Sequence, residues 1–303
     1  MPNVFVTLIN YNGEKDTLDC LESLDKLLIK DFNLNVIIVD NASKEKFEVK
    51  DTYKNFKPEV IRSEQNLGFS GGHNLAIKKA LKLGADYVVI LNNDVLVGSD
   101  LVVNLLKTFK QYEACGIVSP KIYFAKGHEF HKDRYKEENL GKVIWYAGGK
   151  MDWNNVLASH IGVDEVDNGQ FEKQQQTDFA SGCCMMIKRQ VFEKTGVFDE
   201  NYFLYFEDND LCQRAKQKKF EIYFEPSAKL WHLNAGSVGG SGSMMQDYYI
   251  SRNRLYFGFK FAPIRSQLAI FRESFKLLMV GRKWQKIGVK DYYLRKFGKG
   301  SFI

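Results

Sequence analysis

"YVVILNND" (87–94) runs from an apolar, strand-like segment directly into two asparagines and an aspartate. Valine and isoleucine are enriched in strands, and a short continuous apolar run is typical of a strand buried on both faces of a sheet. Similar runs, separated by segments with helical spacing of leucines, occur at 4–10, 35–40 and 59–64. This alternation predicts an α/β protein with a parallel sheet that is covered by helices on both faces.

Polar residues follow the end of each of these four segments. The carboxyl ends of parallel strands meet at one edge of an open α/β sheet, and ligands bind outside that edge. The sequence therefore predicts a ligand site there. The polar residues concerned are Asn10 and Tyr11, Asp40, the glycine-rich segment 66–74, and Asn92, Asn93 and Asp94.

The glycine-rich segment reads "NLGFSGGHN" (66–74). It matches neither the GxGxxG pattern nor a phosphate-binding loop that ends in GK[ST]. Its glycines allow two interpretations. Backbone N–H groups at a helix start can face an anion, or the glycines can supply positive φ angles in a turn. Both interpretations stay open from the sequence alone.

Composition divides the later part of the chain. With 303 residues, 45% of them hydrophobic and 26% charged, the chain is typical of a globular protein. Short aromatic runs between turns predict an antiparallel insert over 121–180. No run approaches the roughly 20 apolar residues of a membrane-spanning helix. The first strand begins without a basic leader, and the five cysteines lack CxxC spacing. We therefore expect a cytoplasmic protein with reduced thiols.

The net charge of +6 is concentrated near the C-terminus, where 252–299 holds 13 Lys and Arg residues against two acids. Apolar residues from Ile264 to Leu278 fall on one helical face, and basic residues flank it. A helix lying on an anionic membrane through 260–299 has this pattern, and so has a helix packed on the body with solvated lysines. No nucleic-acid motif accompanies the charge, so no nucleic-acid partner is expected.

Six motifs, VTLINYN, VIIVDNAS, NLGFSGGHN, ILNND, FLYFEDNDLCQR and WH, occur in this order. The set resembles family 2 glycosyltransferases with the GT-A fold, and is most similar to rhamnosyltransferase-like bacterial members. The resemblance covers roughly 3–257. It implies a Rossmann-like α/β GT-A catalytic domain over 1–250, with a mixed, mainly parallel sheet and helices on both faces. This domain would have a nucleotide-binding part (1–120) and an acceptor part (121–250). A basic amphipathic helical tail would then form 251–303.

The resemblance implies a nucleotide-diphosphate-sugar donor. Tyr11 would flank the base, and Asp40 would accept a hydrogen bond from a uracil or thymine N–H, because a carboxylate is an acceptor-only group. The alternatives are a half-buried aromatic for Tyr11 and a turn residue for Asp40. The other residues assigned to the donor site by the resemblance are Thr7, Asn10, Gly71, Gly72, Asn74, Asn92 and Asn93.

The resemblance also implies a divalent metal, Mn²⁺ or Mg²⁺, that neutralises the departing diphosphate. Asp94 occupies the last position of the family's DxD motif, but Asn92 replaces its first aspartate. The amide lowers the negative charge of the site, so metal affinity would depend on the nucleotide. His232 matches the family's second metal contact, and a nitrogen ligand favours Mn²⁺. The alternative is a histidine satisfied within the protein.

Glu207 and Asp208 match the family's catalytic pair. An inverting transfer needs a base within hydrogen-bond reach of the acceptor hydroxyl. Asp208 is assigned that role, and the adjacent Glu207 would raise its pKa. The alternative is an acidic helix start, which suits Asp210 with Arg214 four residues later. The Gly/Ser-rich segment 234–243 is either a closing loop or a linker.

The leading functional hypothesis is transfer of L-rhamnose from dTDP-rhamnose to a cell-surface polysaccharide or a lipid-linked glycan. Such a protein would be cytoplasmic and could associate peripherally with the inner face of the membrane. One alternative is a nucleotidyltransferase that makes an activated sugar, but "NYNGEKD" (10–16) lacks the basic glycine-rich loop expected for it. Another is a noncatalytic sugar- or membrane-binding protein of the same fold. Retention of Asp40, Asp94, Asp208 and His232 argues against it.

Overall fold

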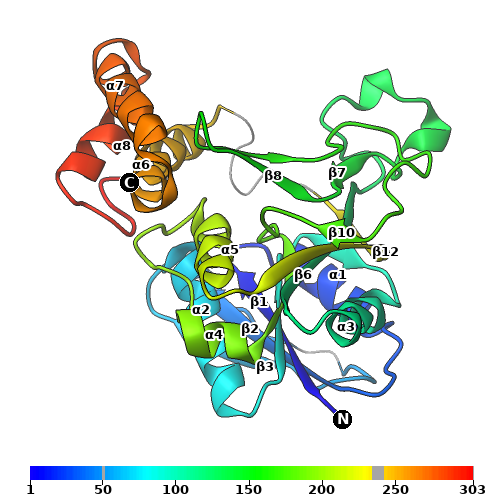
Figure 1. The fold of residues 1–303 in the computed structure, drawn as a ribbon. Coiled ribbons are helices and arrows are strands. Elements are labelled where there is room, and N and C mark those ends of the chain that lie inside the picture. The colour runs from blue at the N-terminus through cyan, green and yellow to red at the C-terminus, as the bar shows by residue number, and fades with distance from the viewer. Residues whose placement is uncertain (50–51, 234–241, 303) are drawn as a thin grey trace.

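The computed structural model describes residues 1–49, 52–233 and 242–302. A ten-stranded mixed sheet lies at the centre, in the order β3-β2-β1-β4-β11-β6-β12-β10, with β5 paired to β12 and β7 to β6 (Figure 1). Its strands are β1 (Asn3–Asn10), β2 (Asn33–Asn41), β3 (Glu59–Ser63), β4 (Tyr87–Leu91), β5 (Val95–Val97), β6 (Cys115–Phe124), β7 (Ile144–Tyr146), β10 (Gln175–Gln176), β11 (Cys184–Lys188) and β12 (Glu221–His232).

Helices cover both faces of this sheet, as predicted. The β1-to-β2 and β3-to-β4 connections run in opposite directions across the sheet, so right-handed crossovers put their helices α1 and α2 on opposite sides (Figure 1). The helices are α1 (Glu14–Leu24), α2 (Gly68–Lys82), α3 (Leu101–Gln111), α4 (Arg189–Thr195), α5 (Glu207–Gln217), α6 (Met244–Phe261), α7 (Ile264–Val280) and α8 (Lys283–Tyr293), with 3₁₀ turns η1 (Lys132–Arg134) and η2 (Glu137–Asn139).

The strand predicted from "YVVILNND" is β4, which ends at Leu91. It pairs in parallel with β1, and β1 pairs in parallel with β2, as predicted. On its other side β4 pairs with β11 in the antiparallel sense, so the sheet is mixed. The last four residues of β4 are buried by helices and neighbouring strands, which explains the absence of alternating polar positions.

The predicted antiparallel insert is confirmed. β7 pairs antiparallel with β6, and β8 (Gly149–Asp152) forms a separate antiparallel pair with β9 (Leu157–His160). The insert and the C-terminal helices both lie beyond the edge of the sheet at which β1 ends (Figure 1). All five cysteines are buried and unpaired, in agreement with the expected thiols.

Helix α6 is continuous through residue 250, where the sequence placed the boundary between catalytic domain and tail. A second apolar cluster joins this helix to the body: Leu255 and Phe257 of α6 pack with Val156 of the insert and with Tyr202 and Phe206. The first half of the C-terminal region therefore shares a core with the body. Within the described ranges, no helix combines the length and apolar character needed to cross a membrane.

Candidate active site

Hydrogen bonds bring together the loops that follow β1, β2 and β4. Asn10 Nδ2 donates to Ser43 Oγ at 3.0 Å, which joins the ends of β1 and β2. The Thr17 hydroxyl joins the end of β1 to the loop after β4: it donates to Asn10 Oδ1 at 3.0 Å and accepts from Asn93 Nδ2 at 2.9 Å. The edge predicted to bind a ligand is therefore formed. Asn10 is itself buried, so it organises these loops.

Asp40 at the end of β2 is fully buried. Its carboxylate accepts the N–H groups of Ser43 at 3.1 Å and Phe47 at 2.9 Å, and it is ion-paired with Arg62. Burial alone would raise the pKa of Asp40, but the hydrogen bonds from Phe47, Ser43 and Arg62 together lower it. This geometry favours the turn-residue interpretation, and base recognition by Asp40 stays a prediction. Tyr11, 49% exposed just beyond β1, has a ring open to a ligand.

The start of α2 is capped by the protein. The Phe69 N–H donates to the carbonyl oxygen of Phe203 at 2.7 Å, and the Ser70 N–H lies 3.4 Å from the same atom. The interpretation of free N–H groups facing an anion is therefore wrong for these two donors. Gly71 and Gly72 lie inside the helix and are buried. A Cβ atom at Gly72 would approach Ile9 Cδ1 to 2.8 Å, so this glycine lets α2 pack closely on β1.

Thr7 and Asn74, which the resemblance assigns to the donor site, are both buried and hydrogen-bonded within the protein, which argues against direct donor contact. The Thr7 hydroxyl is buried, donates to Val89 O at 3.2 Å and lies 3.0 Å from His73 Nδ1. Asn74 is also buried, and its amide exchanges hydrogen bonds with the Phe198 backbone, each at 3.0 Å. Both side chains therefore stabilise the interior, below the edge of the sheet where the ligand site is predicted.

Asp94 and His232 lie together, although they are far apart in the sequence. β5 begins directly after Asp94, and Val95 pairs with His232 of β12. As a result, His232 Nε2 lies 3.3 Å from Asp94 Oδ1. The other ring nitrogen, Nδ1, is buried without a hydrogen-bond partner among the described residues. A neutral imidazole that binds a metal through Nε2 carries its proton on Nδ1, so metal binding here would exchange the contact with Asp94 for a shared metal ion.

One carboxylate and one imidazole are a partial ligand set for Mn²⁺ or Mg²⁺. Across 1–49, 52–233 and 242–302, no group of three or more His, Cys, Asp or Glu side chains is arranged to hold a metal ion. Asp94 and His232 fit a metal only if the donor diphosphate and water complete its coordination. Asn92, on the same loop, is half-buried, and its backbone N–H donates to Cys183 O at 2.9 Å.

Sequence reasoning missed Asp16, on the first turn of α1. Burial raises the pKa of Asp16, and the negative charge of Asp94 raises it further, so the two carboxylates are within electrostatic reach of each other. In the sequence, Asp16 is indistinguishable from an ordinary acid at a helix start. Asp16 thus adds a carboxyl group near the loop on which Asn92 replaces the first aspartate of the DxD pattern.

Glu207 and Asp208, the carboxylate pair, begin helix α5. Asp208 Oδ2 accepts the Gly182 N–H at 2.9 Å, and Oδ1 accepts the Asn209 N–H at 2.7 Å. Burial raises the pKa of Asp208. The pKa of Glu207 is raised well above its ordinary value, first by burial and then by the charge of Asp208. Glu207 Oε2 is buried and has no hydrogen-bond partner within the described ranges. Asp208 is therefore the stronger candidate for an ionised base.

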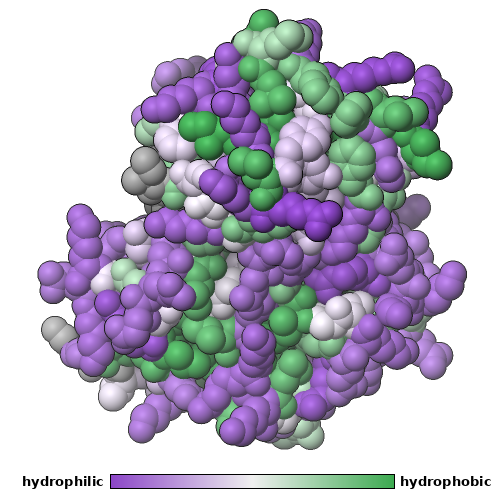
Figure 2. Space-filling view, turned by 90° about the vertical axis from the view of Figure 1, so that its left-hand side faces the viewer, coloured by the Kyte–Doolittle hydropathy of each residue, from purple (hydrophilic) through white to green (hydrophobic). Residues whose placement is uncertain are grey.

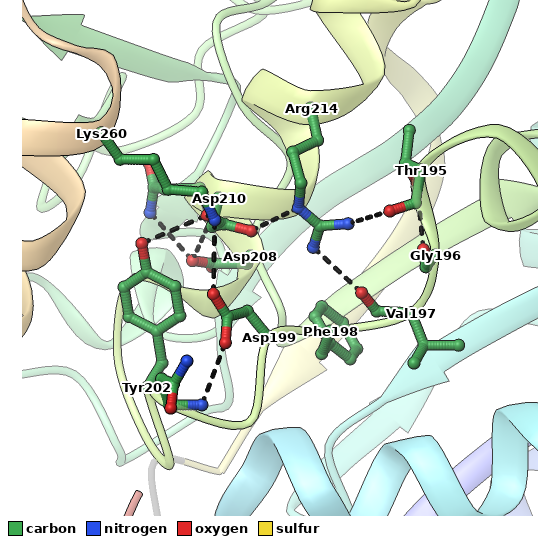
Figure 3. Close-up of polar contacts among 12 residues, drawn as sticks. Thr195, Gly196, Val197, Phe198, Asp199, Tyr202, Asp208, Asp210, Arg214 and Lys260 are labelled. Carbon is green, nitrogen blue, oxygen red and sulfur yellow. Dashed lines mark hydrogen bonds and ion pairs between the residues drawn. The ribbon is translucent and has the colours of Figure 1, made fainter. Parts of the chain in front are cut away.

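Asp210, one turn into α5, has a structural role. Figure 3 shows its carboxylate between Arg214 and Lys260. Both cationic nitrogens lie 2.5 Å from it, and Lys260 Nζ also reaches Asp199 at 3.3 Å. The predicted pairing of Asp210 with Arg214 is confirmed. The second cation comes from α6, so this network joins the start of α5 to the C-terminal helices.

The profile of the family described as "Glycosyl transferase family 2" matches residues 5–196. The chain belongs to glycosyl transferase family 2. The matched part contains β1 to β11 and the loops with Asp40 and Asp94, whereas the carboxylate pair and His232 lie beyond it. The Gly/Ser-rich segment 234–243 was interpreted as a closing loop or a linker. Residues 234–241 of it lie outside the described residues of this glycosyltransferase.

Three relatives of this glycosyltransferase carry informative names. The low-salt glycan biosynthesis hexosyltransferase Agl10 of Haloferax volcanii is 26% identical over 73% of this chain and 64% of its own length. The N-acetylglucosaminyl-diphospho-decaprenol L-rhamnosyltransferase of Mycobacterium tuberculosis is 22% identical over 68% of each chain. The dTDP-rhamnosyl transferase RfbF of Shigella flexneri is 23% identical over 76% of this chain and 69% of its own. The chain thus spans about two thirds of these relatives.

Solved structures share the fold. GalNAc-T7 with UDP, GalNAc and Mn²⁺ superposes with a TM-score of 0.62 at 16% identity, covering 92% of this glycosyltransferase and 56% of that chain. The mannosyltransferase PcManGT of Pyrobaculum calidifontis, with GDP-Man and Mn²⁺, superposes with a TM-score of 0.53 at 15% identity, covering 97% and 74%. These similarities confirm the predicted GT-A architecture.

Proposed function

We propose that this glycosyltransferase transfers L-rhamnose from dTDP-rhamnose to a lipid-linked or cell-surface glycan, with inversion at the anomeric carbon. The observation that carries the proposal is that two consecutive residues, Gly182 and Cys183, connect the candidate base to the loop that contains Asp94. The Gly182 N–H donates to Asp208, while the Cys183 carbonyl accepts from Asn92, two residues before Asp94. The candidate base and the DxD-like loop thus lie on either side of one backbone segment.

In the proposed reaction, Asp208 accepts the proton of the acceptor hydroxyl as that oxygen attacks the anomeric carbon. The bond from this carbon to the diphosphate oxygen breaks, and dTDP leaves with the electron pair. Asp94 and His232 would hold Mn²⁺ or Mg²⁺, which neutralises charge on the departing diphosphate. Burial raises the pKa of Glu207, which favours its neutral form and disfavours a second negative charge beside the base.

The proposed donor and acceptor are inferred from the names of the relatives. Two of the three names specify rhamnosyl transfer, and one specifies dTDP. The Mycobacterium tuberculosis name specifies a sugar on a diphospho-polyprenol, which makes a lipid-linked acceptor the matching proposal. The exposed ring of Tyr11 beside the strand ends suits stacking on a thymine base.

A donor screen tests this function. With Mn²⁺ present, dTDP-rhamnose is expected to raise the melting temperature, because ligand at about 100 times its Kd stabilises a protein by about 2.7 kcal/mol. UDP-galactose and GDP-mannose serve as controls. A rhamnosylated product should form, by mass spectrometry, on a synthetic N-acetylglucosaminyl-diphospho-lipid. Diphosphate release from dTTP and a sugar phosphate would instead identify a nucleotidyltransferase.

We also propose that α7 contacts an anionic membrane, where a lipid-linked acceptor resides. Helix α7 packs on the protein through Ser266, Ile270 and Ser274, and leaves its other face exposed. Ile264 is 75%, Leu268 53% and Met279 71% exposed. Green apolar side chains stand among purple ones over the upper part of the molecule (Figure 2). Arg265, Arg272 and Lys276 of this helix complement an anionic surface. Leu278, predicted on this face, instead packs against the second apolar cluster.

The membrane proposal is tested by changing Ile264, Leu268 and Met279 together to serine. Binding to vesicles containing phosphatidylglycerol at low salt is expected to fall at least about tenfold, because buried apolar area sets the strength of interfacial binding. The matched control changes Leu28 and Leu83, which are 59% and 51% exposed elsewhere, to serine. Equal binding of both variants and the unaltered protein, measured by vesicle sedimentation, would contradict the proposal.

Deletion of 260–303, which would remove the whole of α7, is unsuitable as a test of membrane binding. Arg252 Nη1 donates to Gly298 O at 2.7 Å, so the deletion would also disturb the interior of the protein.

A further inference from the structure

The segment 201–206, directly before the carboxylate pair, has an unusual backbone. Phe203, Tyr205 and Phe206 have φ angles of 63°, 67° and 73°, in the left-handed region. Bulky L-residues adopt this region only at a cost in free energy, so the surrounding structure must hold them there. The same segment caps α2 through Phe203 O. Its shape therefore determines where both α2 and α5 begin.

Asn253 of α6 binds this segment through its side-chain amide. Its Nδ2 atom lies 2.8–2.9 Å from the carbonyl oxygens of Tyr202, Leu204 and Tyr205. The amide orientation is fixed, because Asn253 Oδ1 accepts a hydrogen bond from Arg252 Nε at 2.9 Å. One amide thus bridges carbonyl groups on both sides of the left-handed Phe203.

Arg252 extends the same set of contacts. Its Nη2 atom donates to Asn201 O at 3.1 Å and to Tyr202 O at 2.9 Å, and its Nη1 atom to Gly298 O. Arg252 and Asn253 are both fully buried. A buried guanidinium bound mainly to carbonyl oxygens is expensive to desolvate, and two of its hydrogen-bond acceptors lie on the segment that precedes Asp208.

We infer that Arg252 and Asn253, the α6 clamp, position Asp208 for proton transfer by holding 201–206 in its left-handed conformation. The inference rests on the proposed role of Asp208 as the base. Neither clamp residue touches a reacting atom in this arrangement, so both are positioning residues. The C-terminal helices, taken from the sequence as a separate tail, thereby become part of the catalytic apparatus.

The test compares Asn253→Ala and Asn253→Asp with Arg254→Lys in the full-length chain. Aspartate keeps the size of asparagine but supplies no N–H donor. Arg254 is a matched control on the same helix, because it binds the Asn155 carbonyl and Glu273 instead of 201–206. The measurements are hydrogen exchange at 201–206, binding of dTDP with Mn²⁺, and the kcat and pH profile of transfer from dTDP-rhamnose to the synthetic N-acetylglucosaminyl-diphospho-lipid.

Both Asn253 variants are expected to lose about 10²-fold in kcat, since a misplacement of about 1 Å can cost that much. The rate of hydrogen exchange at 201–206 should rise, and the affinity for dTDP should stay within about twofold of that of the unaltered enzyme. The acid limb of the pH profile of kcat should move. Arg254→Lys should match the unaltered enzyme. A kcat that falls only in proportion to dTDP-binding capacity, with an unmoved acid limb, overturns the inference.

Failure of the proposed function gives a different result. An active Asp208→Asn enzyme would remove the base assignment whatever the Asn253 variants do. If Asp208→Asn is inactive and Asn253→Asp keeps full kcat, the α6 clamp alone is refuted.

Discussion

Asp208→Asn is expected to lower kcat by about 10³-fold, because a positioned general base contributes about 10²–10⁴-fold to such reactions. The amide is the same size and its oxygen can still accept one of the two backbone N–H groups that Asp208 binds, from Gly182 or from Asn209, so the fold and the dTDP affinity should be largely retained. The measurement is steady-state transfer from dTDP-rhamnose, with dTDP binding measured in parallel. Turnover within about tenfold of the unaltered enzyme would remove Asp208 as the base.

Glu207→Gln is the matched control for this prediction. Burial raises the pKa of Glu207 and so favours its neutral form, which the amide resembles, so this change should reduce kcat far less than the change at Asp208. Because burial raises the pKa of Asp208, activity should fall with decreasing pH at a value above the ordinary carboxyl pKa of 3.8. The base must be ionised to accept a proton, so the loss lies on the acid side. A large defect in Glu207→Gln would assign the base to the other carboxyl group.

Asp94→Asn is expected to abolish Mn²⁺-dependent binding of dTDP and to lower kcat/KM by at least about 10²-fold. Asp94 is the carboxylate of the DxD-like loop and lies 3.3 Å from His232, so its loss leaves the imidazole as the remaining ligand of the pair. Thermal shift with dTDP, titrated with Mn²⁺, is the measurement. An unchanged Mn²⁺-dependent shift would show that the metal binds elsewhere.

Asn92→Asp is the companion variant. It restores the first carboxylate of the DxD pattern and should increase Mn²⁺ affinity in the absence of nucleotide, because ligand charge increases the affinity of a site for a hard cation. Opposite effects at positions 92 and 94 would separate loss of a ligand from general damage to the loop.

Local signals in the sequence predicted the framework well. The apolar runs at β1, β2 and β4 are continuous because these strands are covered on both faces, and each ends at the predicted edge. The approach of Asp94 to His232 followed from the family motifs, since nothing in the residues between them specifies a contact. Pairing of β5 with β12 creates that contact.

The hydrogen-bond partners of the buried polar side chains could not be predicted from local sequence patterns. Asp40 and Asn74 have the residue types of ligand contacts, but their polar atoms are bound by backbone groups, in the case of Asn74 from a distant segment. The cap of α2 by Phe203 and the burial of Arg252 also depend on contacts far apart in sequence. A charged residue in a basic stretch is ordinarily exposed, so the sequence placed Arg252 in a surface tail.

The position of β11 between β4 and β6 has a consequence for the order in which the nascent chain can fold. β6 pairs with β7, β11 and β12, all of which follow it in the sequence. Residues 1–120 therefore cannot complete their share of the sheet alone, and the free edge of β4 stays unpaired until β11 has left the ribosome. At about 5–20 residues per second this takes several seconds. Throughout that interval the edge of an apolar strand is unpaired, and an unpaired apolar edge is a template for incorrect pairing with another chain.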